Sequence, residues 1–63
     1  MDVPPAGSSV IVLGIRGLDG CLGTVVDTVL ECGWVSCKIR LAPRPGDAHL
    51  MEHVWLDPSS LTR

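Results

Sequence analysis

The chain contains no phenylalanine, no tyrosine and only two tryptophans, and it carries little charge. A core without Phe or Tyr must be built mainly from branched aliphatic side chains. Only 19% of the residues are charged and 46% are apolar, a balance that excludes a wholly disordered chain. The longest apolar run, Val10–Leu13, spans four residues, far fewer than the roughly eighteen of a membrane-spanning helix. With 63 residues, the chain is one small domain and too short for a two-domain enzyme.

Basic residues are also scarce. Five Lys and Arg stand against seven Asp and Glu, giving a net charge of −2. Nucleic-acid binding depends on Lys and Arg that displace counterions from phosphates, so a basic surface over the whole domain is excluded. A local basic patch remains an alternative, formed by Arg16, Lys38, Arg40 and Arg44.

The cysteine content and the N-terminus bear on the compartment. Three cysteines are an odd number, which argues against a closed disulfide framework and for reduced thiols. Residues 1–5 have neither the basic segment nor the apolar segment of a secretory signal. We therefore expect a cytoplasmic protein.

The residue pattern predicts an all-β chain. No window shows the apolar stripe of a helix, whereas short β-branched runs recur between turn residues. Glycine at every third position from Gly14 to Gly23 indicates a long, tightly turned loop, with Asp19-Gly20 as its sharpest turn. The predicted elements are a flexible N-terminal arm at 1–8, strands at 10–13, 23–30, 34–41 and 49–57, and a 3₁₀ turn at 57–61.

The clearest element is the strand at 34–41, where apolar and polar side chains alternate. One face carries Val35, Cys37, Ile39 and Leu41, and the other carries Trp34, Ser36, Lys38 and Arg40. The same alternation at 53–57 separates Val54 and Leu56 from Trp55. The predicted interior consists of Val25, Val35, Cys37, Ile39, Val54 and Leu56.

Four stretches give the chain a resemblance to SH3-like small barrels, and among them to KOW-type modules. They are Gly7–Val12, Gly20–Val26, Val35–Ile39, and Val54–Leu56 with Ser59–Leu61. The resemblance implies an SH3-like barrel at 9–63, made of four to five short antiparallel strands and ending in a C-terminal 3₁₀ turn. Within it, Gly23 would let the chain bend sharply as it enters a strand. It also implies an RNA- or DNA-associated module as the alternative function. The peptide grooves and methyl-group cages of related barrels need several aromatic side chains, which this chain lacks.

The spacing of two cysteines and two histidines resembles that of a zinc site. Cys32 and Cys37, followed by His49 and His53, nearly match the ligands of a C2H2 finger. Such a finger needs its histidines one turn apart on a helix, and on a strand His49 and His53 would stand roughly 13 Å apart. We therefore expect no metal site, and we predict no cofactor.

Catalysis is not expected either. The chain has no phosphate-binding glycine motif and no nucleophile elbow. It is similar to the plasmid-type dihydrofolate reductases in its length, its N-terminal arm and its predicted barrel. Their Val-Gln-Ile-Tyr strand, however, corresponds here to His53-Val54-Trp55-Leu56, so the residues of that site are missing. An active site formed only between subunits stays open as an alternative.

The two tryptophans are the strongest functional signal. Alternation places both opposite the aliphatic interior, and Trp is enriched at interface hot spots. The strand at 10–13 is apolar on both faces, so one side has no place in the interior. The sequence thus predicts a non-catalytic module that associates with itself or with a protein partner. The predicted contact residues are Trp34, Trp55, Ile11, Leu13 and His53.

Overall fold

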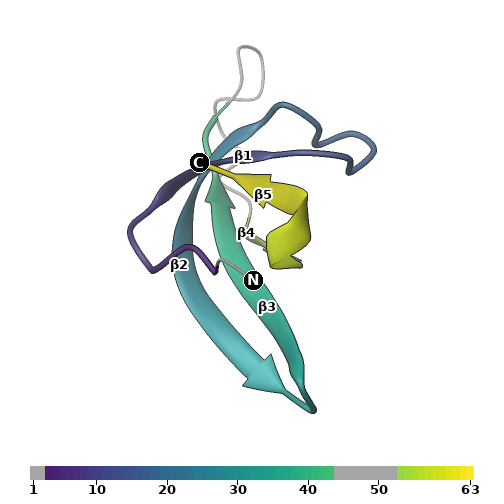
Figure 1. Cartoon of the computed structure of the whole chain (residues 1–63). Helices are drawn as coiled ribbons and strands as arrows, with labels where there is room; N and C mark the ends of the chain where they lie inside the picture. The colour runs from purple at the N-terminus through teal and green to yellow at the C-terminus, as the bar shows by residue number, and fades with distance from the viewer. Residues whose placement is uncertain (1–2, 44–52) are drawn as a thin grey trace.

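The computed structural model describes residues 3–43 and 53–63 and forms a single antiparallel sheet of five strands (Figure 1). The all-β prediction is therefore confirmed. The strands are β1 (Ser9–Val12), β2 (Leu22–Glu31), β3 (Trp34–Leu41), β4 (His53–Leu56) and β5 (Leu61–Thr62). Their order across the sheet is β4-β3-β2-β1-β5, so β4 and β5 are the edge strands.

The predicted strand boundaries agree closely with these elements. The third strand is found at 34–41 as predicted, the second gains one residue at each end, and the first lies one residue earlier than expected. The fourth strand was predicted at 49–57 and is observed at 53–56, with positions 49–52 outside the described residues. Residues 3–8, within the predicted arm, lie against the sheet. Pro4 is buried and the Gly7 N–H donates to the Val25 carbonyl at 2.7 Å.

The C-terminal 3₁₀ turn is also confirmed, as η1 (Pro58–Ser60). Asp57 caps it, because its side chain accepts a hydrogen bond from the Ser59 N–H at 2.8 Å. Pro58 occupies the first turn, where its fixed φ fits and no N–H is needed. Since Pro58 is also buried, the turn ties the chain end to the sheet.

The glycine-rich segment between β1 and β2 is a series of tight turns, as its sequence predicts. Asp19 accepts a hydrogen bond from the Gly14 N–H through Oδ1 at 2.6 Å, which closes the loop across five residues. Gly20 has a φ of 84° and donates its N–H to the Val12 carbonyl. Glycine is required at such a position because left-handed φ values strain other residues.

The long hairpin of β2 and β3 extends well beyond the other strands (Figure 1). Its turn is Cys32-Gly33, and both residues have positive φ, at 53° and 76°. Two such residues make a hairpin turn whose twist matches that of the flanking strands. Counting outward from this turn places Glu31 opposite Trp34 and Val29 opposite Ser36.

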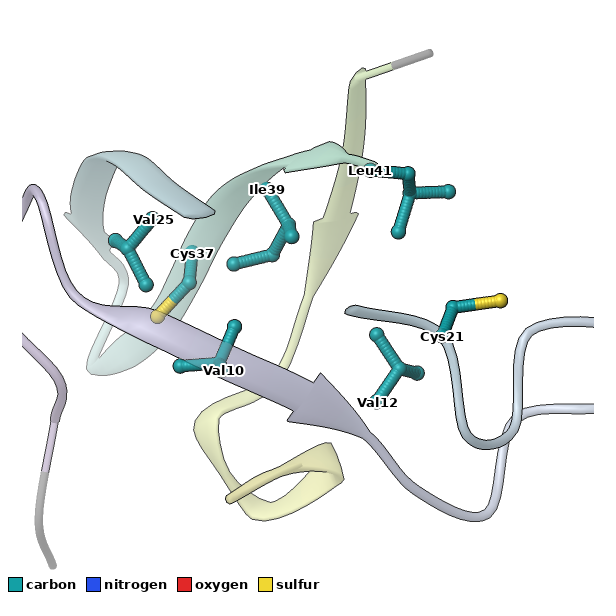
Figure 2. Close-up of a cluster of buried hydrophobic side chains, with 7 residues drawn as sticks. All are labelled: Val10, Val12, Cys21, Val25, Cys37, Ile39 and Leu41. Carbon is teal, nitrogen blue, oxygen red and sulfur yellow. The ribbon is translucent and has the colours of Figure 1, made fainter. Parts of the chain in front are cut away.

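The core lies on one face of the sheet and is aliphatic and thiol-rich (Figure 2). Its buried members are Val10, Val12, Cys21, Val25, Cys37, Ile39 and Leu41. Val54 and Leu56 were predicted in the interior and pack, partly buried, against this cluster.

One interior prediction needs correction. Val35 shares the inner face but is only half-buried, because the hairpin carries it past the end of the packed cluster, opposite Leu30. Gly23 is the second residue of β2, where it pairs with both Val10 and Leu41 and has no left-handed φ. It is small because a Cβ there would stand 2.5 Å from Ile39 Cγ2.

Candidate functional site

The candidate site lies on the face of β2, β3 and β4 opposite the core, called here the outer face. Strand alternation puts Trp34, Ser36, Lys38 and Arg40 of β3 on this face. The register then adds Trp55 beside Lys38 and His53 beside Arg40. Because the core needs only the inner side chains, the outer ones reach solvent, with Ser36 and Lys38 half-buried and the others exposed.

Both tryptophans are strongly exposed, Trp34 at 66% and Trp55 at 51%. They border a hollow of about 430 Å³ on the outer face. We call this depression the tryptophan hollow. It is lined by Val29, Glu31, Trp34, Ser36 and Trp55. Trp is usually mostly buried in a folded domain, so two indoles exposed at one depression indicate a contact surface.

Two of the lining residues, Val29 and Glu31, come to the site through the hairpin register. Glu31 lies opposite Trp34, and Val29 lies opposite Ser36. Sequence reasoning did not assign Val29, Glu31 and Ser36 to the contact surface. The signal was present in Cys32-Gly33, since a two-residue turn fixes which residues face each other across the hairpin.

The outer face carries charges of both signs. The Lys38 ammonium lies 5.9 Å from the centre of the Trp55 ring, within the usual range of a cation–π contact. Asp27 lies directly opposite Lys38 in the sheet, and Glu31 lies opposite Trp34. The Asp27 carboxylate also accepts a hydrogen bond from the Thr28 N–H at 2.8 Å. Positive and negative side chains are therefore interleaved around the indoles.

The other predicted contact residues do not join this hollow. His53 is exposed on the outer face, next to Arg40. Ile11 is half-buried and pairs with Leu22, at the opposite end of β2 from Glu31 and roughly 30 Å away along the strand. Leu13, at 46% exposure, follows β1 at that same end of the sheet. The predicted surface is thus divided into two separate regions.

The residues of the nucleic-acid alternative are also divided. Lys38 and Arg40 lie on the outer face, close to Trp55. Arg16 is exposed in the loop between β1 and β2, and Arg44 lies outside the described residues.

The cysteines show no reactive arrangement within the described chain. All three thiols are free, with Cys32 exposed at the hairpin turn and Cys21 and Cys37 buried. Burial raises the pKa of the Cys37 thiol, against a smaller lowering effect of the Thr28 hydroxyl. No three metal-ligating side chains gather among residues 3–43 and 53–63, and His49 of the zinc-like spacing lies outside them.

Comparison with protein-family models, with curated proteins and with solved structures gives no match for this chain. The SH3-like and KOW-type resemblance therefore stays a prediction from the sequence. Within the part of the chain that the structure describes, no helix has the length and hydrophobicity that crossing a membrane requires.

Proposed function

We propose that this protein is a non-catalytic interaction module that binds a protein partner, or a second copy of itself, through the tryptophan hollow. The single observation that carries the proposal is the exposure of Trp34 and Trp55 around one depression. Aromatic side chains supply large contact areas with few rotatable bonds, and interface hot spots are enriched in them.

The area available at the two indoles sets the scale of binding. With 66% and 51% of Trp34 and Trp55 accessible, complete coverage removes roughly 300 Å² from water. At about 25 cal/mol per Å², this gives roughly 7 kcal/mol before the cost of association. Association costs at least about 4 kcal/mol, so the indoles alone support weak binding and a tighter complex needs the surrounding residues.

The mixed charge around the hollow favours a protein partner. Lys38 faces Asp27 across the sheet, and among the described residues that line the hollow the charged one is the acidic Glu31. A protein surface can match such an alternating pattern, whereas a phosphate backbone would meet carboxylates beside the indoles.

The test uses an array of random peptides and three single variants of the whole chain. Trp34→Ala and Trp55→Ala each remove one wall of the hollow, and Leu22→Ala is the matched control because Leu22 is 61% exposed but does not line it. We expect the two tryptophan variants to lose the peptides that the wild type binds and Leu22→Ala to retain them. Sedimentation at micromolar concentration gives the same comparison for self-association. A monomer whose tryptophan variants keep every peptide contradicts the proposal.

A second candidate function, association with RNA or DNA, is favoured by one observation. Lys38 and Arg40 lie on the same face as the two indoles, and single-stranded nucleic acid binds where basic and aromatic side chains alternate. This candidate predicts binding of a single-stranded oligonucleotide that weakens steeply as salt rises. No binding at low salt, or binding that is indifferent to salt, eliminates it.

A further inference from the structure

Within residues 3–43 and 53–63, the tryptophan hollow is lined by an acidic group and by no basic one. Among its five described lining residues, Glu31 alone is charged, and it lies directly across the hairpin from Trp34. The electron-rich faces of indoles attract cations, so the two aromatic walls and the carboxylate favour the same charge. Resting on the proposed function, we infer that the partner inserts an arginine side chain of an extended peptide into this hollow.

The chain already holds one cation against one of these indoles, that of Trp55. The Lys38 ammonium lies 5.9 Å from the centre of the Trp55 ring, but Lys38 does not line the hollow. The Trp55 indole thus contacts the Lys38 side chain and also borders the tryptophan hollow. The contact shows that Trp55 is accessible to a cation within this sheet.

The depression is large enough to hold one long side chain. Its volume of about 430 Å³ lies toward the lower end of the range for ligand sites. The register places Glu31 beside Trp34 and Trp55 beside Lys38, so the guanidinium would lie at Trp34 and Glu31 while the apolar stem packs on Val29 and Trp55. The Ser36 side chain, on the strand between them, adds a small polar floor.

Arginine suits this lining better than lysine does. Its planar guanidinium stacks on aromatic rings and forms forked hydrogen bonds with a carboxylate, and it is less strongly hydrated than an ammonium. Less hydration free energy is therefore lost when an arginine side chain, rather than a lysine side chain, enters a partly exposed site. We expect an arginine peptide to bind more tightly than the same peptide with lysine.

The experiment titrates the whole chain with capped Gly/Ser peptides that differ only at a central residue. Arginine is compared with citrulline, its neutral isostere, and with norleucine, a neutral apolar side chain. We expect the arginine peptide to bind about tenfold more tightly than the citrulline peptide. Equal affinity for arginine and citrulline, or no saturable binding of the arginine peptide up to about 10 mM, overturns the inference.

Two matched variants locate the charge dependence. Glu31→Gln removes the carboxylate in the hollow, and Asp27→Asn removes a carboxylate on the same strand and face outside it. We expect Glu31→Gln to weaken the arginine peptide roughly five- to tenfold and to leave the norleucine peptide unchanged. Asp27→Asn should change neither, since Asn can still accept the Thr28 hydrogen bond. An unchanged affinity in Glu31→Gln contradicts the role given to Glu31.

The outcomes also separate this inference from the proposed function. If arginine and citrulline bind alike while Trp34→Ala abolishes binding of array peptides, the contact surface stands and the cation preference is wrong. If Trp34→Ala changes no binding at all, both are wrong. An oligonucleotide that binds through Lys38 and Arg40, with no affinity for the arginine peptide, also overturns the inference.

Discussion

Adding one methyl group at Gly23 should destabilise the sheet at its centre. Gly23 lies inside β2, where it is buried and paired with Leu41. A Cβ at this position would stand 2.5 Å from Ile39 Cγ2 and 3.2 Å from the Arg40 carbonyl oxygen. Carbon atoms in ordinary contact are about 3.5–4.0 Å apart, so Ile39 would have to move by roughly 1 Å.

The surrounding core leaves little room for that movement. Ile39 has no exposed surface and packs among other buried side chains, and the carbonyl of Arg40 belongs to the β3 backbone. Overpacking of this kind costs about 1–3 kcal/mol. Replacing glycine lowers the entropy of the unfolded chain, which offsets about 0.4–1 kcal/mol. The net loss of roughly 1–2 kcal/mol is large for a domain of this size, whose total stability is about 3–9 kcal/mol.

Urea unfolding followed by circular dichroism measures this loss for Gly23→Ala. Circular dichroism is preferred because both tryptophans are already strongly exposed in the folded chain, so we expect their emission to change little on unfolding. Ile39→Leu removes the branch methyl that clashes, so the double variant should be more stable than the two single losses predict, by at least about 0.5 kcal/mol. A Gly23→Ala protein within about 0.3 kcal/mol of wild type, or strictly additive losses, refutes the steric explanation.

Three further predictions concern the hairpin turn, the C-terminal cap and the thiols. Cys32 has a φ of 53°, a conformation that Asn tolerates better than other non-glycine residues do. Cys32→Asn should therefore raise the free energy of unfolding, measured in urea, by about 0.5–1 kcal/mol. A lower free energy of unfolding contradicts this prediction. The Ser59 N–H and hydroxyl hold the pKa of the Asp57 carboxyl below its ordinary value of 3.8. The ionised carboxylate therefore stabilises the fold above pH 3.8, and this contribution disappears as the pH falls through the lowered pKa. Thermal melts from about pH 5 to pH 2 should therefore show a smaller acid loss in Asp57→Asn than in wild type, and identical acid losses contradict the cap. Because Cys37 is buried and its pKa is raised, an alkylating reagent should modify exposed Cys32 first and Cys37 only in urea; early modification of Cys37 contradicts its burial.

The strands were predictable because their signals are local. Alternation at 34–41 fixed both the extent of β3 and the outward direction of Trp34. The Asp57-Pro58 pair indicated the 3₁₀ turn through its capping chemistry. Each of these features depends on neighbours in the sequence, so a single chain suffices to read them.

The composition of the core and of the hollow depends on distances that sequence alone does not provide. Val35 has the correct alternation for the core but lies on the part of the hairpin that extends past it. Ile11 and Trp34 both face away from the core, yet their strands place them at opposite ends of β2. Glu31 joins the site only through the register across the hairpin turn. Alternation predicts which face a residue occupies, whereas its position along that face requires the strand pairing.

The proposal that Trp34 and Trp55 form one contact surface is tested most directly by the two indole N–H signals in an NMR titration. The whole chain, labelled with ¹⁵N, is titrated with the peptide that it binds most tightly on the array. Both indole signals should shift together and saturate with the same affinity, while the amides of the core strand β1 stay in place. A peptide that binds with saturation and leaves both indole signals unmoved would contradict the account.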